Sequence, residues 1–372
     1  MTLSDICELI VDCPHSTAKD EGAGYPLIRT PNIGRGRLIL DDVHRVSKDI
    51  YDKRNARAIP QDDDLILARE APAGNVAIIK NGEQVCLGQR TVLIRPDKRK
   101  VYPDFLVYYI LAPQQQYELL GTANGATVAH VNIPVIKALP VELPAIEVQQ
   151  KAADILKAYD DLIENNQKQI KLLEEAAQRL HKEWFVDLQF PGHENTEIVD
   201  GLPEGWSNAK VTDLLEIKYG KDHKALEEGD IPVYGSGGIM RKVQPVLYSG
   251  ESVLIPRKGS LNNILFVEGD FWTIDTMFYS IPRLENVAKY AYLYLCGLDM
   301  YSFNIGAAVP SMTTKILSGM DIVLPSKQIL QQFEEQLSPV FARMKCLEMQ
   351  CETAAEARDR LLPKLMSGEI EL

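Results

Sequence analysis

The most regular hydrophobic pattern of the chain lies in two long segments, one in the middle and one near the C-terminus. In each segment, mostly apolar residues recur at alternating steps of four and three. The first series is Tyr159, Ile163, Asn166, Ile170, Leu173, Ala177, Leu180 and Trp184. The second series is Val340, Met344, Leu347, Cys351, Ala354, Arg358, Leu361 and Leu365. This spacing is typical of the seam of a coiled coil, so it predicts two helices that pack on each other.

Both segments lack an internal glycine, which favours long and uninterrupted helices. Helices of about 35–40 residues would form a rod of roughly 50–60 Å. The prolines Pro339 and Pro363 are expected near the ends of the second helix, with Pro339 in its first turn. Asn166 within the seam would fix the register of the pair at some cost in stability. The alternative is two separate amphipathic helices, each on its own domain.

A block with strand-like runs precedes each predicted helix. β-Branched and apolar residues bounded by Gly, Pro and Asn predict three strands in each block. These runs are Leu65–Glu70, Asn75–Lys80 and Arg90–Pro96, then Ser252–Lys258, Asn263–Gly269 and Met277–Arg283. An aromatic-rich helical stretch follows in both blocks. Its helical spacing favours a core position over base stacking for four tyrosines: Tyr108, Tyr109, Tyr292 and Tyr294.

A shift of 181 residues aligns the two halves of the chain. The stretch "VELPAIEVQQ" at 141–150 matches "DIVLPSKQILQQ" at 321–332, with a Leu-Pro pair in each. The helical segments also match, because Glu175, Ala176, Arg179 and Leu180 fall on Glu356, Ala357, Arg360 and Leu361. Upstream, Gly125, Ala126 and Val128 fall on Gly306, Ala307 and Val309. This period is far longer than that of a solenoid repeat, so it indicates a duplicated unit of one domain and one helix.

These patterns together predict an α+β protein. Two globular α/β domains are joined by two long helices that form a coiled coil, with a pseudo-two-fold internal repeat. The expected boundaries are a first domain at 1–145, a central helix at 146–189, a linker at 190–204, a second domain at 205–325, and a distal helix with the C-terminal tail at 326–372. The linker is assigned because its region is rich in Gly, Pro and acidic residues.

The net charge of −12 taken alone argues against nucleic-acid binding, because a phosphate-binding surface is basic. Its distribution changes this conclusion. Residues 1–145 carry 17 bases and 18 acids, and residues 205–325 carry 11 bases and 13 acids. The two domains therefore have net charges of only −1 and −2, and the helices and linker carry the other −9. A nearly neutral domain can still present a basic face if its charges are segregated.

Basic residues cluster at predicted strand ends and loops in both domains, beside polar side chains that can read base edges. Arg is suited to guanine, and Asn or Gln to adenine, in the major groove. Arg69 and Arg257 occupy matching places after two strand-like runs. The candidates for DNA contacts are Arg29, Thr30, Asn32, Arg35, Arg37, Arg69, Gln89, Arg90, Lys218, Lys221, Tyr234, Ser236, Arg241, Lys242, Arg257, Lys258, Asn262 and Asn263.

Motifs of catalysis are missing from the sequence. It contains no P-loop and no Asp/Asn-Pro-Pro-Tyr/Phe string of the amino-methyltransferase type. The cysteines and histidines are scattered, so we expect no catalytic residue, no metal site and no cofactor. Asp200, Glu216 and Lys218 only loosely resemble a nuclease carboxylate–lysine set. No apolar run reaches the roughly 18 residues of a membrane span, and the N-terminus is unlike a signal peptide, so a cytoplasmic location is expected.

The chain resembles the specificity subunits of type I restriction–modification enzymes. The resemblance is carried by the helical segment from Gln149 through "FPG" at 190–192, by "LPEGW" at 202–206, and by "LLPKLMSGEIEL" at 361–372. In organisation it covers the whole chain: recognition domain, central helix, recognition domain, distal helix. The first domain departs from the pattern because it lacks the "LPEGW" opening of the second.

The resemblance implies a non-catalytic subunit that recognises a bipartite double-stranded DNA target. Each domain would read one half-site, and the antiparallel helices would set the spacing between them. Two modification subunits, which bind S-adenosylmethionine and methylate adenine N6, would dock on the helices. Restriction subunits would join that complex and use ATP and magnesium to translocate and cleave DNA.

Two other functions remain open from the residues alone. The net negative charge is compatible with a coiled-coil scaffold whose domains do not read DNA. A stand-alone DNA-modifying enzyme is the second alternative, and the missing motifs weigh against it.

Overall fold

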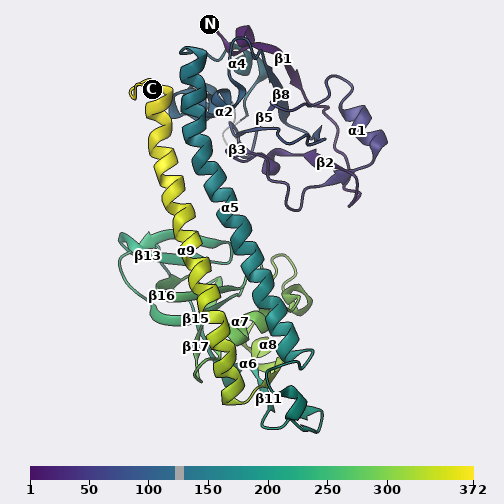
Figure 1. Cartoon of the computed structure of the whole chain (residues 1–372), viewed down its shortest axis with the longest axis vertical. Helices are drawn as coiled ribbons and strands as arrows, with labels where there is room; N and C mark the ends of the chain where they lie inside the picture. Colours follow the sequence, from purple (N-terminus) through teal and green to yellow (C-terminus); the bar gives the residue numbers. More distant parts are fainter. Residues whose placement is uncertain (122–129) are drawn as a thin grey trace. The chain divides into compact units, whose positions relative to one another are not determined.

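The computed structural model describes residues 1–121 and 130–372. It divides into two units, the first formed by Met1–Asn166 and Met349–Leu372, the second by Gln167–Glu348. Each unit contains one globular domain and one segment of each long helix (Figure 1). The repeat positions Gly125, Ala126 and Val128 lie outside the described residues.

The two long helices predicted from the seam are confirmed. They are α5 (Ile146–Phe185) and α9 (Lys327–Met366), with 40 residues each. Pro339 lies well inside α9, so the expectation that it occupies the first turn is wrong. Proline lacks the N–H that would bond the carbonyl four residues earlier, but Pro339 is exposed, so water can reach that carbonyl. The same spacing continues ahead of Val340 through Leu337 and Phe333, which are both buried, and the predicted series did not include these turns.

In the first unit, α5 and α9 run antiparallel. Asn166 is only 2% exposed, and its Nδ2 donates to Oε1 of Gln350 at 3.1 Å. Further along, Arg358 donates from Nη1 to Oδ1 of the buried Asp160 at 2.6 Å. Residue numbers therefore rise on one helix as they fall on the other. The predicted place of Asn166 in the helix contact is confirmed.

The second unit repeats this antiparallel contact with different side chains. Nη2 of Arg343 donates to Oε1 of Gln169 at 3.2 Å. Further along, the rings of Trp184 and Phe333 lie with their centroids 5.4 Å apart. Seam positions on both helices are buried here, among them Ala177 and Met344. An apolar seam thus holds the helices together in the second unit.

The described part of the first domain contains two sheets, and all three of its predicted strands are present. A five-stranded sheet has the order β1 (Cys7–Asp12), β8 (Thr91–Pro96), β5 (Leu65–Ala68), β6 (Val76–Ile78) and β3 (Gly36–Arg37). A three-stranded sheet has the order β4 (Arg45–Val46), β2 (Tyr25–Ile28) and β7 (Cys86–Leu87). The helices are α1 (Lys48–Arg54), α2 (Pro103–Leu111), α3 (Pro113–Leu120) and α4 (Ile133–Ala138).

The second domain is built on a six-stranded sheet. Its order is β12 (Leu215–Tyr219), β17 (Met277–Pro282), β15 (Tyr248–Pro256), β16 (Leu265–Thr273), β13 (Glu228–Gly235) and β14 (Gly238–Val243). The other elements are α6 (Val211–Leu214), α7 (Ala288–Cys296), α8 (Thr314–Gly319) and the pair β11 (Ser207–Lys210) and β18 (Asp321–Leu324). The three strands predicted here are also present.

The predicted linker is folded over part of its length. Strands β9 (Ile198–Val199) and β10 (Leu202–Pro203) form a small hairpin. The rings flanking it, Phe190 and Trp206, are buried and lie 4.9 Å apart between centroids. This contact fixes where α5 leads into the second domain.

Backbone contacts confirm the 181-residue repeat. In the first unit, Leu3 N–H donates to the Leu139 carbonyl at 2.9 Å. In the second, Val211 N–H donates to the Met320 carbonyl at 3.1 Å, and 139 plus 181 is 320. In the first unit, the last part of α9 occupies the position that residues 167–185 of α5 occupy in the second unit. The two units are thus circular permutations of one arrangement.

Both domains pack their helices against α5 and α9. In the first unit, Leu362 and Leu365 of α9 join Phe105 of α2 in one buried cluster. Tyr108 and Tyr109 are 6% and 4% exposed, which confirms that they belong to the core. Burial of apolar surface, which stabilises by about 25 cal/mol per Å², is the main force that holds each domain on the helices.

An aromatic cluster surrounds a buried histidine in the second unit. The ring of His181 lies 5.3 Å from Phe185, 5.5 Å from Tyr290 and 6.2 Å from Phe333, measured between centroids. Its Nε2 has no hydrogen-bond partner among the described residues. Burial lowers the pKa of His181 to about 4. Leu362 occupies the matching repeat position in the first unit and is also buried.

We predict that His181 lowers the free energy of unfolding as the pH falls from about 6.5 to about 4. Over that range the unfolded state, with an ordinary histidine pKa, binds a proton that the folded state does not. His181→Leu copies the residue of the other unit and should remove this contribution. Chemical denaturation of both proteins at several pH values measures the difference in stability between them.

The difference between the two proteins should be constant above pH 7 and should grow in favour of the variant towards pH 4. Subtracting one profile from the other cancels the carboxylates that both proteins share. A difference that does not change with pH would contradict the prediction.

Candidate nucleic-acid interface

Three loops of the second domain meet at one place. Nδ2 of Asn263, after β15, donates to the carbonyl of Ser236 in the β13–β14 turn at 2.9 Å. The N–H of Gly259 donates to the carbonyl of Pro310 at 2.9 Å. The N–H of Met312 donates to the carbonyl of Arg257 at the same distance. Candidate residues that are distant in sequence are therefore brought together.

The first domain builds the same frame. Nδ2 of Asn75 donates to the carbonyl of Ile33 at 3.0 Å, as Asn263 does to its own partner. The N–H of Val131 donates to the carbonyl of Arg69 at 2.9 Å. Asn75 follows Arg69 by six residues, as Asn263 follows Arg257. Arg69 and Arg257 are thus equivalent in structure as well as in sequence.

Arg69 is enclosed by other groups of its domain. Its Nη1 lies 3.1 Å from Oδ1 of Asp12, and its Nε donates to the Val131 carbonyl at 2.9 Å. Its Nη2 lies 2.8 Å from Nε2 of His130, and Nδ1 of His130 lies 2.6 Å from Glu70. The side chain of Arg69 is only 10% exposed. The guanidinium is therefore used to join a strand end to a neighbouring loop.

Arg257 has a different environment at the equivalent place. Its Nη1 donates to the carbonyl of Asp275 at 3.0 Å. Its guanidinium carbon lies 5.4 Å from the ring centroid of Tyr219, a residue that is 51% exposed. Tyr219 was not among the predicted candidates. It ends a strand 38 residues before Arg257, so only the tertiary fold reveals this contact.

Several other candidates hold the fold. Asn32 is buried, accepts the Arg29 N–H at 3.1 Å and donates to the Ile39 carbonyl at 3.2 Å. Arg37 binds Asp161 and Glu164 of α5. Burial alone would lower the pKa of Arg37, but these acidic partners outweigh it and the pKa is raised.

The 18 candidates differ in accessibility. Exposed residues are Arg35, Arg90, Lys221, Lys242 and Asn262. Half-buried residues are Arg29, Thr30, Arg37, Gln89, Lys218, Tyr234, Ser236, Arg241, Arg257, Lys258 and Asn263. Asn32 and Arg69 are buried. Contact of any of them with DNA stays a prediction.

Local partners occupy some of the accessible candidates. Lys218 forms an ion pair with Glu216 at 2.6 Å, and Arg90 pairs with Glu70. Oδ1 of Asn262 accepts the N–H of Met300 at 2.8 Å. Lys221 and Lys258 have no side-chain partner within the described parts of the chain. These two lysines are therefore the better placed for contacts with phosphate.

Comparison with known proteins shows the family. A family model for the type I restriction modification DNA specificity domain matches residues 1–175 and 203–350. The chain belongs to this family. The two matched stretches each contain one globular domain and part of the helix that follows, so the family unit occurs twice. This match does not favour the scaffold and stand-alone enzyme alternatives.

Named relatives of this DNA specificity family cover most or all of the chain. The type I restriction enzyme MjaIX specificity subunit of Methanocaldococcus jannaschii is 26% identical over an alignment that covers 100% of this chain and 93% of the relative. The HindI specificity subunit of Haemophilus influenzae is 22% identical, with 84% of this chain and 88% of the relative covered.

A solved structure shares the fold. The type I restriction–modification S subunit of M. genitalium matches with a TM-score of 0.58 and 18% identity, covering 98% of this chain and 95% of that one. At this identity the likeness concerns the fold alone. Among the described residues, no helix has both the length and the apolar composition that crossing a membrane would require.

We predict that Asn32 acts on stability and that the exposed Lys242 does not. Asn32→Ala removes both hydrogen bonds of a buried amide, which costs about 1–3 kcal/mol. Lys242→Gln changes one exposed side chain and should leave stability within about 0.5 kcal/mol. Urea denaturation followed by fluorescence measures both. Equal midpoints for the two variants would contradict the structural role of Asn32.

Proposed function

We propose that this chain is the DNA-reading subunit of a type I restriction–modification complex. Each domain contacts one half of a split double-stranded target, and α5 and α9 set the spacer between the halves. One observation carries this proposal: the family domain occurs twice, with the same loop frame but different side chains on it. Two readers of this kind can recognise two different half-sites.

The chemistry is proposed to come from partner subunits. Modification subunits would bind S-adenosylmethionine and methylate adenine N6, and restriction subunits would use ATP and magnesium. Within residues 1–121 and 130–372, no three His, Cys, Asp or Glu side chains gather as a metal site would require.

The exposed surface of the helices is proposed as the docking site for two modification subunits. Glu175 and Arg179 form an ion pair at 3.8 Å on α5, and Glu356 and Arg360 form the matching pair at 3.5 Å on α9. The two arginine side chains are 83% and 81% exposed. Surface pairs of this kind contribute about 0–1 kcal/mol, so stability does not explain why both units keep them. Binding of the same kind of partner by both units would explain why the pair occurs twice.

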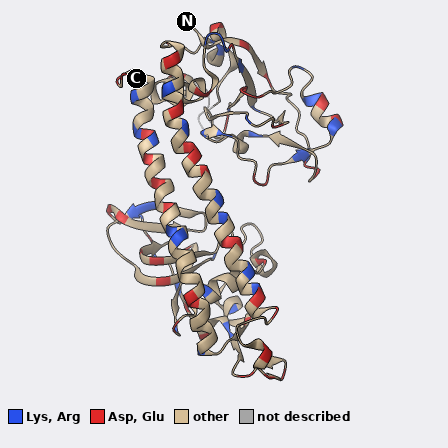
Figure 2. Cartoon of the chain, in the orientation of Figure 1, with Lys and Arg blue, Asp and Glu red and all other residues tan. Residues whose placement is uncertain are grey.

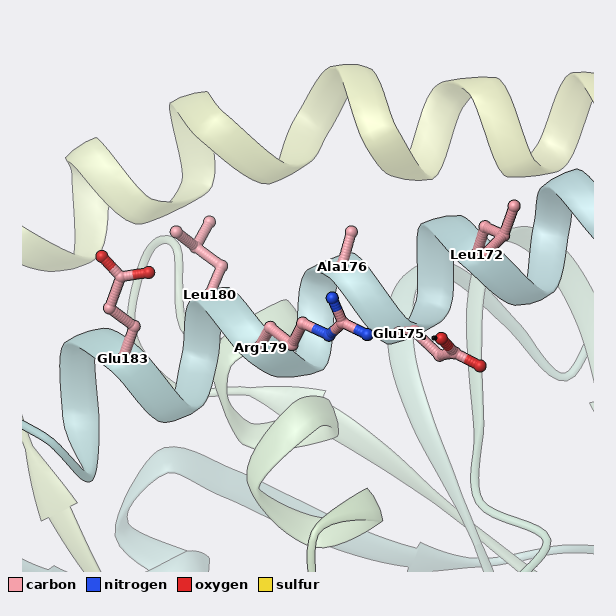
Figure 3. A pocket seen from close by; sticks show the side chains of 6 residues that line it. All are labelled: Leu172, Glu175, Ala176, Arg179, Leu180 and Glu183. Atoms are coloured by element: carbon pink, nitrogen blue, oxygen red, sulfur yellow. Dashed lines mark ion pairs between the residues drawn. The ribbon is translucent and has the colours of Figure 1, made fainter.

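The surroundings of the α5 pair suit a protein partner. A depression of about 260 Å³ is lined by six residues of α5 alone, namely Leu172, Glu175, Ala176, Arg179, Leu180 and Glu183 (Figure 3). Leu172 is 64% exposed, so an apolar contact lies beside the charged ones. Acidic and basic residues both occur along the two helices (Figure 2). A partner surface with complementary charges and an apolar residue would match this pattern.

The test of DNA reading is a map of N6-methyladenine in cells that contain this chain and its modification subunit. We expect a split motif with a fixed spacer. Exchange of residues 205–325 for the corresponding domain of a relative should change only one half of that motif. A single continuous motif, or a change in both halves after the exchange, would refute the proposal.

The test of docking uses charge exchange on each helix. Glu175→Arg with Arg179→Glu, and Glu356→Arg with Arg360→Glu, keep an intrahelical pair and the net charge but invert the surface. Each exchange should remove one modification subunit, so the mass of the purified complex falls by one subunit. Both exchanges together should remove two.

The control for docking is Lys242→Gln, an exposed change in a domain far along the chain from either pair. It should leave two modification subunits bound. A complex that keeps both subunits after both exchanges would exclude these helix faces as the docking site.

A further inference from the structure

We propose that Arg257 reads a guanine in the half-site of the second domain, and that its structural equivalent Arg69 does not read a base. This inference rests on the proposed function and makes it more specific. Guanine is the base for which an arginine can make two hydrogen bonds at once, to O6 and N7. The argument depends on how each guanidinium is held.

The backbone of Arg257 is fixed on both sides. Its N–H donates to the Thr276 carbonyl at 2.8 Å, and its carbonyl accepts the Met312 N–H at 2.9 Å. The side chain therefore starts from a rigid point between two loops. A reader that is already ordered loses less entropy when it binds than a free surface arginine does.

The side chain of Arg257 is also oriented. One N–H donates to the Asp275 carbonyl at 3.0 Å, and the guanidinium lies over the Tyr219 ring at 5.4 Å. Tyr219 is itself supported by Phe278, a fully buried ring whose centroid is 5.0 Å away. An arginine placed on an aromatic ring keeps the edge of its guanidinium free for in-plane hydrogen bonds.

The charge of Arg257 remains available. Of five N–H donors, one is used, and within residues 1–121 and 130–372 no carboxylate lies within ion-pair distance of it. Lys258 follows it directly, and Lys221 lies two residues after Tyr219. Neither lysine has a side-chain partner among the described residues, so both can bind phosphates on either side of the base that is read.

Arg69 has a backbone that is fixed in the same way, by the Arg90 carbonyl and the Val131 N–H, but its guanidinium is held differently. Asp12 neutralises its charge, and a carbonyl and a histidine take further donors. With its side chain 10% exposed, Arg69 cannot reach a base without breaking a buried ion pair. The two domains therefore do not share a base-reading residue at this position, although they share the frame.

The experiment uses the complete complex of this chain with its modification subunits. After the wild-type motif has been mapped, binding is measured on duplexes in which each guanine of the second half-site is replaced in turn by 7-deazaguanine, which lacks the N7 acceptor. We expect one position to weaken wild-type binding by about tenfold or more. In the Arg257→Gln complex the same replacement should have no further effect.

Variants that keep the charge or the ring give matched controls. Arg257→Lys should weaken discrimination at this one position, because lysine lacks the planar pair of donors. Tyr219→Ala should reproduce much of that loss, and Tyr219→Phe should not. Arg69→Lys should leave the preferred bases of both half-sites unchanged while lowering the denaturation midpoint.

Each result decides the question. A second half-site without guanine on either strand overturns the inference, as does a 7-deazaguanine effect of the same size in wild-type and Arg257→Gln complexes. An equal loss of binding on all sequences in Arg257→Lys would make Arg257 a phosphate contact and also overturn it. A wild-type motif that is not split would refute the proposed function itself. The outcomes above refute only the role of Arg257, so the two failures can be distinguished.

Discussion

Both units depend on burial of the apolar faces of α5 and α9, which neither helix can achieve alone. Antiparallel pairing hides one face of each helix, and the domains cover more of the apolar surface. The first domain includes Leu362 and Leu365 in its core, residues that come from the far end of the chain. Its core is therefore complete only after the last helix has been made, so this domain is tied to long-range contacts during folding.

The two domains are attached to the helices by different chemistry. In the first unit, Asp160 is 5% exposed and accepts hydrogen bonds from Tyr108 at 2.6 Å and from Arg358 at 2.6 Å. In the second unit, the matching repeat position is Phe341, whose ring centroid lies 5.0 Å from that of Phe266 and 5.9 Å from that of Tyr292. A buried ionic contact gives little net stability but has strict geometry, whereas an aromatic cluster stabilises through area. Equivalent backbones thus permit unlike packing.

The sequence predicts the periodic parts of the structure well. The seam, the six strand-like runs and the 181-residue shift all follow from local spacing, and the structure contains them. Local spacing fails where tertiary contacts decide. The burial of Arg69 follows from its contact with Asp12, 57 residues away, and no local pattern could reveal it.

The frame that carries the candidate interface is made largely from backbone groups, and this explains how the domains could diverge. The carbonyls of Arg69 and Arg257 accept equivalent N–H donors, and such bonds do not depend on the side chain of either residue. Asn75 and Asn263 add the same contact from the side. Only the surroundings of each guanidinium differ: a carboxylate in one domain, a tyrosine ring in the other. A change in one neighbour, with the backbone bonds intact, can therefore turn a structural arginine into one that faces a ligand.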